Sequence, residues 1–403
     1  MSRAGGSARS PTGWSASRRR SPVARPSRRA SGSSWRRCGS SCSGCSARRS
    51  RPTTCTADPR WCNCRAGSWS GDLGEAERGA PPLVPVIVGP TGVGKTAVVA
   101  AWAALEPISV VSADARQVYR GLDIGTAKPP DELLARVPHV GLDVVQPGER
   151  YSAGQFARDA AAWLAEIRSA GRQPVVVGGT GFYVRALAEG LFHEPPLDAV
   201  RRERLRVWTA RLPVARLAHW AARLDRRFAG GGRQRAARAI EVALLTGRGL
   251  SWWQEHARAT GAMRPWYIHL TLPRDALERR IADRVDAMLT AGLVAEVRRT
   301  LDRSVAPDAP GLDGVGYREV VAMLAGRLPE RGLREAIVVA TRRYAKRQET
   351  WFRNQIPGGR GMGKGEGVWS LDATERPDVL AARISDRWHA VTLPHSPFPI
   401  PRS

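Results

Sequence analysis

Short apolar runs separated by helical patterns organise the chain from about residue 83 onward. Each run is followed by a longer stretch with different periodicity, and the clearest runs are Leu83–Val88, Ile108–Val111, Pro174–Val177 and Trp266–Leu272. Alternating strands and helices are typical of a parallel sheet that is covered on both faces. The pattern therefore predicts an α/β fold with a parallel sheet core and helices on both faces.

The helical patterns divide the chain further. Residues 153–170 have apolar positions at helical spacing, and a second long helix is expected at residues 274–301. Residues 197–262 interrupt the alternation, because they look wholly helical, Arg-rich and Trp-bearing. We predict a first core part at 81–195, an all-helical insertion domain at 196–265, and a second, largely helical core part at 266–390.

The two ends of the chain lack a core-forming pattern. Residues 1–80 are rich in Arg, Ser, Gly, Pro and Cys, so we expect disorder there, and residues 391–403 form a Pro-rich tail. The cysteines in this stretch are irregularly spaced and no histidine accompanies them, which favours an accident of composition over a metal site. An Arg-rich targeting presequence is a third alternative. The cysteines are Cys38, Cys42, Cys45, Cys55, Cys62 and Cys64.

The charge of the chain points to an anionic partner. The formal net charge is +26, and the first 80 residues carry 16 Arg against 4 acidic residues, so the remainder is strongly basic as well. A field of this sign favours polyanions, nucleic acid first. No apolar run approaches the roughly 20 residues needed to span a bilayer. We expect a soluble, cytoplasmic protein that acts as a monomer and has no membrane partner.

The first stretch with candidate chemistry directly follows the run Leu83–Val88. It is a complete phosphate-binding loop, formed by Gly89, Pro90, Thr91, Gly92, Val93, Gly94, Lys95 and Thr96. Glycines at this spacing let successive backbone N–H groups turn toward a phosphate oxygen, the lysine adds a mobile charge, and the last hydroxyl is suited to a divalent metal. The loop predicts a polyphosphate ligand, and by itself it leaves open whether that ligand is a nucleotide.

Two further stretches follow predicted strands, where open α/β sheets place their ligands. Asp114, in the segment Val111–Pro129, is a candidate metal carboxylate or general base, with a helix-capping role as the alternative. The glycines of the segment Val177–Tyr183 let the backbone and the Thr180 hydroxyl approach a ligand closely. A plain strand-to-helix turn explains that segment equally well.

The order of these motifs closely resembles that of the tRNA dimethylallyltransferases, also called tRNA isopentenyltransferases. The resemblance covers about residues 83–355 and rests on GPTGVGKT, SADARQVYRGLDIGTAKP, PHVGLDVVQPGERYSAGQF and VVVGGTGFYVRAL, followed by QRAARAIEV, RIADRV, GVGYRE and KRQETWFR. Such a run of motifs in order is far more specific than any one of them. The resemblance implies a P-loop parallel sheet core of the bacterial type.

The resemblance also implies a reaction: transfer of the dimethylallyl group from dimethylallyl diphosphate to N6 of the adenosine 3′-adjacent to the anticodon, in tRNAs that read codons beginning with U. The phosphate loop would hold the diphosphate with Mg²⁺, with Thr96 as the metal ligand. Asp114 would take the proton from the adenine amine, and Thr180 would lie against the diphosphate. Arg284, helped by Arg280, would lie on the leaving group, and their spacing places both on one face of a helix.

A set of tRNA-binding residues is implied in the same way, with the anticodon stem-loop as their partner and the insertion domain clamping the stem. Cations neutralise phosphates, and planar side chains stack on or hydrogen-bond to an unstacked base. The set comprises Asp114, Ala115, Arg116, Gln117, Thr180, Arg201, Gln234, Arg235, Ala236, Ala237, Arg238, Gly314, Val315, Gly316, Tyr317, Arg318, Glu319, Lys346, Arg347, Gln348, Glu349, Thr350, Trp351, Phe352 and Arg353.

The chain departs from the family pattern at several positions. Ala115 stands where the family usually has Ser, which removes a hydroxyl beside the candidate base. The sequence Gly231-Gly232-Arg233 replaces an Asn-Asp-Pro sequence, and this predicts a weaker helix cap. No cysteine follows Cys64, so we expect no C-terminal zinc finger of the kind that some eukaryotic relatives have.

Three other classes of function share part of the pattern. A P-loop kinase has the loop but transfers a phosphoryl group from ATP. An isopentenyltransferase that acts on free AMP or ADP has no need of a helical insertion or an Arg-rich C-terminal half. A non-enzymatic RNA-binding protein does not require the phosphate loop and Asp114 together.

Overall fold

The computed structural model describes residues 80–192, 197–257, 259–356 and 368–392. The predictions of disorder for residues 1–79 and of a metal site at the cysteines lie outside the described residues, as does the tail from residue 393 onward. The strands are β1 (Leu83–Val88), β2 (Ile108–Ser112), β3 (His139–Val140), β4 (Gln173–Gly178), β5 (Arg264–Thr271) and β6 (Val368–Asp372).

Helices make up most of the remaining described chain. They are α1 (Lys95–Trp102), α2 (Asp131–Arg136), α3 (Ala153–Ser169), α4 (Gly181–Glu189), α5 (Ala199–Arg211), α6 (Val214–Leu224), α7 (Arg233–Thr246), α8 (Leu250–His256), α9 (Arg274–Thr290), α10 (Leu293–Asp302), α11 (Tyr317–Leu324), η2 (Glu330–Gly332), α12 (Leu333–Gln355) and α13 (Pro377–Thr392).

The strands form one parallel sheet in the order β3-β2-β4-β1-β5-β6. The apolar runs explain this arrangement, because strands that are buried on both faces read as continuous Val- and Ile-rich segments rather than alternating ones. β1, which leads into the phosphate loop, lies inside the sheet between β4 and β5.

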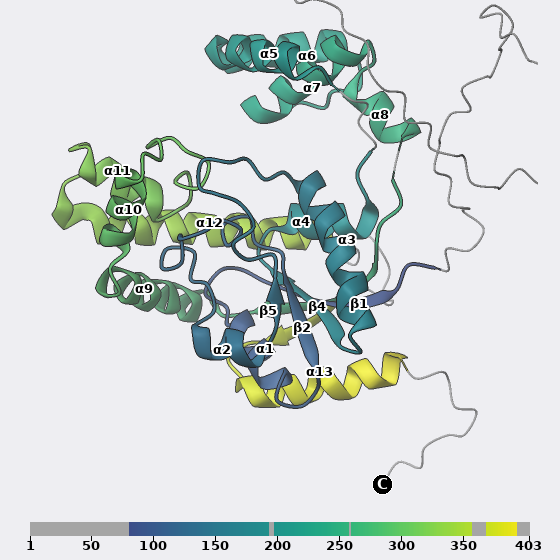
Figure 1. Cartoon of the computed structure of the whole chain (residues 1–403), viewed down its shortest axis with the longest axis vertical. Helices are drawn as coiled ribbons and strands as arrows, with labels where there is room; N and C mark the ends of the chain where they lie inside the picture. The colour runs from purple at the N-terminus through teal and green to yellow at the C-terminus, as the bar shows by residue number, and fades with distance from the viewer. Residues whose placement is uncertain (1–79, 193–196, 258, 357–367, 393–403) are drawn as a thin grey trace, which may run out of the picture. The chain divides into compact units, whose positions relative to one another are not determined.

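Helices cover both faces of the sheet (Figure 1), which confirms the predicted fold class. On one face α3, α4 and α12 pack against the strands through Phe156, Tyr183 and Phe352. On the other face α1 and α13 pack through Trp102 and Trp388. The α3 helix starts as its sequence predicts, with Ser152 at the N-cap of a complete capping box.

The structure corrects the sequence prediction at three places. The sheet has two edge strands that the apolar runs did not indicate, β3 and β6, because β3 is very short and β6 is only half-buried. The single helix predicted at residues 274–301 is wrong: α9 ends at Thr290 and α10 begins at Leu293. Gly292 lies between them with φ 97°, a backbone angle that favours glycine and ends the first helix.

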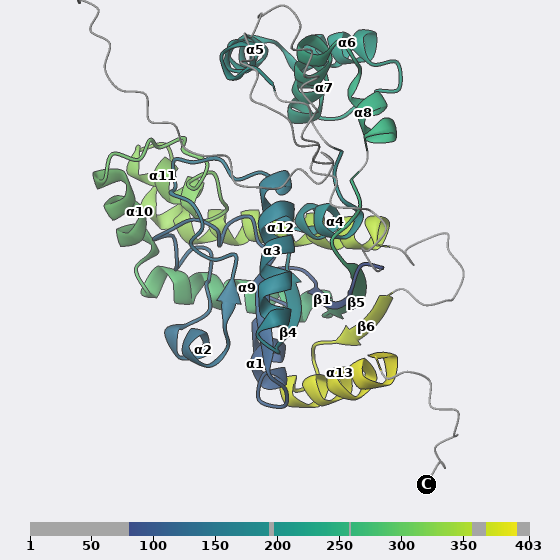
Figure 2. The same cartoon turned by 45° about the vertical axis from the view of Figure 1, so that its right-hand side comes forward.

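The insertion is all-helical, as predicted, and consists of α5 to α8, which Figure 2 shows gathered as one bundle. Its small core is built around Leu217 on α6 and Ile240 on α7. β5 already begins at Arg264, so the insertion ends before the predicted residue 265. The expected weak cap is confirmed, because Gly232 makes no side-chain hydrogen bond at the start of α7.

A second helical layer consists of α9 to α12 and encloses a separate core. Val118 and Leu122, from the segment after β2, pack there with Val297 of α10 and Ile337 of α12. The segment after β2 is therefore anchored on helices that come much later in the chain. Among the described helices, none is both long and apolar enough to cross a membrane.

Candidate active site

The three predicted motifs meet because they follow three adjacent parallel strands. β1 leads into the phosphate loop, β2 into Asp114 and β4 into Thr180, and the carboxyl ends of parallel strands lie at one edge of a sheet. The ends of β2 and β4 are joined directly: the Ala113 N–H donates to the Val177 carbonyl at 2.8 Å, and the Thr180 N–H donates to the Ala113 carbonyl at 3.2 Å. Residues far apart in the sequence thus form one site.

The phosphate loop has the backbone that its glycines predict. Gly89, Gly92 and Gly94 have φ angles of 153°, 83° and 106°, which side chains disfavour. Lys95 begins α1, and its Nζ donates to the carbonyls of Gly89 and Pro90, at 2.9 Å each. The ammonium group is therefore held at the loop, next to the N-terminus of a helix, where a phosphate is favoured.

Arg280 and Arg284, predicted to act together on the leaving group, have different surroundings. Arg280 is exposed, and its guanidinium donates to the carbonyls of Val93 at 3.0 Å and Ala373 at 3.1 Å, so the structure shows it supporting the loop. Burial lowers the pKa of Arg284, while the nearby Asp114 carboxylate raises it. Of the two arginines, Arg284 is therefore the one beside the candidate base.

Two cations face one carboxylate in this site. Burial lowers the pKa of Lys95 to about 8; the Asp114 carboxylate counteracts that shift and the Arg284 guanidinium adds to it. Two cations that are held near each other away from water repel, and an anion between them relieves the repulsion. The electrostatics of the site thus suit a ligand with several negative charges.

The candidate base lies in a tight turn that Thr180 supports. Asp114 Oδ1 accepts from the Arg116 N–H at 2.8 Å, so a local capping contact, the alternative weighed from sequence, is present. Thr180 Oγ1 accepts from the Ala115 N–H at 3.0 Å. Because the backbone of Ala115 makes this contact, the missing serine hydroxyl does not break it.

Tyr344 on α12 belongs to the site, although it lies outside the motifs that predicted the site. Its hydroxyl interacts with that of Thr180, and burial followed by the Asp114 carboxylate raises its pKa to about 12. The phenol is therefore neutral at physiological pH. A signal was available, because Tyr344 and Gln348 are four positions apart and lie on one face of the helix that carries the KRQETWFR motif.

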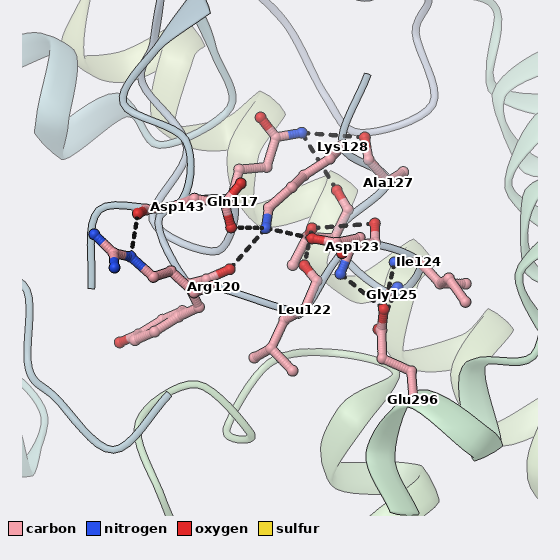
Figure 3. Close-up of polar contacts among 12 residues, drawn as sticks. Gln117, Arg120, Leu122, Asp123, Ile124, Gly125, Ala127, Lys128, Asp143 and Glu296 are labelled. Atoms are coloured by element: carbon pink, nitrogen blue, oxygen red, sulfur yellow. Dashed lines mark hydrogen bonds and ion pairs between the residues drawn. The ribbon is translucent and has the colours of Figure 1, made fainter. Parts of the chain in front are cut away.

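The segment after β2 is folded around a buried carboxylate (Figure 3). Glu296 of α10 accepts the backbone N–H groups of Asp123, Ile124 and Gly125 at 2.8, 2.9 and 3.3 Å. It also accepts the Tyr317 hydroxyl at 2.7 Å. Three successive N–H groups around one anion fix the loop in a single conformation.

Lys128 and Gln117 fix the same loop from inside (Figure 3). Lys128 Nζ donates to Asp123 Oδ1 at 2.5 Å and to Asp143 Oδ1 at 2.6 Å, with its side chain only 6% exposed. Gln117 Nε2 donates to the Ala127 carbonyl at 3.1 Å. Gln117, predicted to face tRNA, thus has its amide nitrogen engaged within the loop.

The predicted tRNA-binding residues divide by exposure. Those with exposed side chains are Arg201, Gln234, Arg235, Arg318, Lys346, Arg347, Thr350 and Arg353. Those with buried side chains are Ala236, Tyr317, Gln348 and Phe352. Their side chains face the protein interior, so at these four positions it is the backbone that is left to contact RNA.

A basic groove joins two of the predicted RNA motifs. It has a volume of about 660 Å³ and is lined by Phe182, Arg185, Arg235, Arg343, Lys346, Arg347, Thr350, Trp351, Asn354 and Gln355. Phe182, which the sequence motifs did not single out, is 51% exposed and lies two positions after Thr180. An exposed aromatic ring among cations is a surface on which an unpaired base can stack.

The remaining predicted residues of the insertion have mixed surroundings. The Arg201 and Gln234 side chains are exposed. Arg238 donates to Glu241, a buried carboxylate that also receives Arg202 at 3.0 Å. Glu241 thus links α5 to α7 through Arg202, while Arg238 pairs with it inside α7 and is 30% exposed.

Most of the chain is similar to known proteins of one family. A family model described as IPP transferase matches residues 117–355. The tRNA dimethylallyltransferase of Geobacter sulfurreducens is 40% identical over 284 residues, which cover 69% of this chain and 91% of that protein. That of Halorhodospira halophila is 44% identical over 279 residues, covering 68% and 90%.

Solved structures give the same result. The tRNA isopentenylpyrophosphate transferase of Bacillus halodurans aligns with a TM-score of 0.56 and 32% identity, over 77% of this chain and 96% of that one. A eukaryotic dimethylallyltransferase acting on tRNA shares the fold, with a TM-score of 0.63 at 24% identity over 77% and 80% of the two chains. The chain described here belongs to the tRNA dimethylallyltransferase family.

Proposed function

We propose that this protein transfers the dimethylallyl group from dimethylallyl diphosphate to N6 of the adenosine 3′-adjacent to the anticodon, in tRNAs that read codons beginning with U. The observation that carries the proposal is the convergence of the phosphate loop, Asp114 and Thr180 at the carboxyl ends of three adjacent strands. Close relatives bear the name of this activity. The proposal includes action as a monomer.

The charges of the site suit such a reaction. The amine nitrogen of adenine attacks the allylic carbon of the dimethylallyl group, the bond from that carbon to the diphosphate oxygen breaks, and the nitrogen loses a proton. Lys95 and Arg284 lie where they would balance the charge of the departing diphosphate. Asp114 lies beside both cations and takes the proton.

The residues present fit a magnesium ion that is bound largely through its substrate. Thr96 is exposed at the start of α1, directly after Lys95. Within the described part of the chain, no group of three or more His, Cys, Asp or Glu side chains could hold a metal. Mg²⁺ usually keeps several waters and binds few protein oxygens together with substrate phosphates. Thr96 would be its protein ligand, and the ion would neutralise diphosphate charge.

The basic groove supports tRNA as the acceptor. Arg235 of the insertion and Lys346 of α12 line the same groove, so a strand of RNA that follows it meets cations from both parts. Phe182 lies on the rim, two residues from Thr180, and offers a ring for a base that has left its stack. A free nucleotide would use neither the groove nor the insertion.

The test is to incubate the protein with Mg²⁺, labelled dimethylallyl diphosphate and unmodified tRNA, and to map the label by nuclease digestion. We expect label on one adenosine, next to the anticodon, with release of diphosphate. Label on AMP or ADP in preference to tRNA would assign the protein to the class that acts on free nucleotides. Release of ADP from ATP with a small acceptor, and no prenyl transfer, would assign it to the kinases.

A further inference from the structure

The Gln348 side chain joins two segments of the site that the sequence keeps far apart. It is 6% exposed on α12, and its Oε1 accepts the Thr91 N–H of the phosphate loop at 2.9 Å. Its Nε2 donates to the Gly179 carbonyl at 2.9 Å. Gly179 immediately precedes Thr180, so one amide connects the diphosphate loop with the turn that carries the threonine.

Only a narrow range of side chains can make this connection. One partner is a backbone donor and the other is a backbone acceptor, and a neutral primary amide offers an acceptor and a donor at the same end of the side chain. A carboxylate offers acceptors alone, and an ammonium group offers donors alone. Gln348 is therefore matched to Thr91 and Gly179 by chemistry as well as by length.

The turn has no freedom to move toward α12. A Cβ atom on Gly179 would lie 2.1 Å from Gln348 Nε2, and one on Gly181 would lie 2.0 Å from the ring of Trp351. The turn thus rests directly on the inner face of α12. Tyr344, one helical turn before Gln348, interacts with the Thr180 hydroxyl from the same face.

We propose that Gln348 is a positioning residue for the transfer reaction. It sets the separation between the phosphate loop and Thr180, so that the diphosphate is held from both sides while Asp114 takes the proton. The proposal rests on the proposed function for the identity of the reaction. It replaces the expected role of Gln348 in RNA binding, because both ends of its amide are already used and its side chain is buried.

The test uses Gln348→Glu, which keeps the length of the side chain and makes its hydrogen bonding depend on pH. A protonated carboxyl group has one acceptor and one donor, as the amide does, whereas an ionised one would face the Gly179 carbonyl without a donor. Burial raises the pKa of a carboxyl group above its ordinary value of about 4.3. The single-turnover rate of the variant is divided by that of the wild type at the same pH. This ratio reports whether the protonated or the ionised form of the introduced carboxyl group supports the reaction.

We expect this ratio to lie near one at pH 5.5 and to fall at least tenfold by pH 8. Gln348→Leu should give a low ratio that does not change with pH. Gln173→Glu is the matched control, because Gln173 lies at the opposite end of β4 from the site, and its ratio should stay near one. The dissociation constant for tRNA should change less than twofold in all three variants.

Several results would overturn the proposal. One is a wild-type rate in Gln348→Leu at every pH; another is a loss in Gln348→Glu that is independent of pH or that appears as weaker tRNA binding. A rate ratio that follows the melting temperature of each variant, rather than the pH, would assign Gln348 a purely structural role. Absence of prenyl transfer by the wild-type protein would instead refute the proposed function, so the two failures are distinguishable.

Discussion

The two faces of α12 carry opposite chemistry within one sequence motif. On the inner face, Gln348 is 6% exposed and hydrogen-bonded to the phosphate loop, and Tyr344 interacts with Thr180. On the outer face, Lys346 and Arg343 are exposed and line the basic groove. The inner face therefore acts on the geometry of the reacting groups, and the outer face acts on the charge that an RNA strand meets.

Polar residue type alone was a poor guide to which side chains of this helix are available to RNA. The KRQETWFR motif resembles an RNA-binding segment throughout, since nearly all of its residues are polar or aromatic. Helical periodicity separates them: Gln348 and Phe352 are four positions apart and both are buried, whereas Lys346 and Thr350 are four apart and both are exposed. The two faces should accordingly respond to mutation in different quantities, rate on one side and affinity on the other.

The largest effect is expected at Asp114, the candidate base on the side of the inner face of α12. Asp114→Asn keeps the shape of the side chain and removes its basicity, so we predict that kcat falls by about 10²–10⁴. The dissociation constants for tRNA and for the diphosphate substrate should change little, because the base acts as the bond forms. Steady-state kinetics with both substrates varied provides the measurement. Weaker Mg²⁺-dependent diphosphate binding at unchanged kcat would make Asp114 a residue of the metal site.

A smaller effect on rate is expected from the hydroxyl of the inner-face tyrosine. Tyr344→Phe removes the hydroxyl that interacts with Thr180, a contact worth about 1 kcal/mol, so kcat should fall roughly five- to tenfold with tRNA affinity unchanged. Tyr151→Phe is the matched control, since it deletes a hydroxyl that donates to Asp159 at 2.6 Å, a residue that is not among the candidate site residues. Equal losses of kcat in the two variants would remove Tyr344 from the site.

The pH dependence of diphosphate binding tests whether the Lys95 cation helps to hold the diphosphate. Burial lowers the pKa of Lys95 to about 8, so free protein loses this charge as the pH rises through 8, whereas a bound anion favours the charged form. Affinity for Mg²⁺-pyrophosphate should therefore be full below pH 8 and fall up to about tenfold by pH 9. In Lys95→Arg, the cation does not titrate in this range, so the part of the fall in affinity that Lys95 causes should vanish. Parallel pH profiles for the two proteins in isothermal titration would contradict this assignment.

The smallest effect is expected on the outer face. Arg343→Ala should weaken tRNA binding several-fold at about 0.15 M salt and should reduce the slope of log affinity against log salt by about 0.7–0.9, the loss of one phosphate contact. Arg331→Ala removes the same charge from the exposed η2 segment, outside the residues that line the groove, and should leave both quantities unchanged. A shared change in both variants would mean that overall charge, rather than the groove, sets the affinity.

The sheet and its site edge were predictable because their signals are local. Buried runs such as Leu83–Val88 indicate strands, and a phosphate loop or an acidic residue directly after a run falls at the same sheet edge. The break at Gly292 was missed because a single glycine is tolerated in many helices, and only its φ of 97° shows that it ends one.

Contacts between distant segments could not be predicted in this way. Glu296 folds the loop at Asp123–Gly125 from more than 170 positions away, and no local pattern marks a carboxylate as the partner of three backbone N–H groups. The bond from Gln348 to the phosphate loop joins residues 257 positions apart. Phe182 was missed for a different reason, because its exposure becomes visible only once α4 and α12 are packed together.

The most direct test of the two-face account introduces methionine separately at two positions of α12, one on each face. Gln348→Met removes a buried amide, and Lys346→Met removes an exposed cation. In both variants the new side chain has a volume similar to that of the old one. Single-turnover rate at saturating tRNA and the tRNA dissociation constant are measured side by side. The account predicts that Gln348→Met lowers the rate at least tenfold with the dissociation constant within twofold, and that Lys346→Met raises the dissociation constant several-fold with the rate within twofold. Loss of the same quantity in both variants would contradict it.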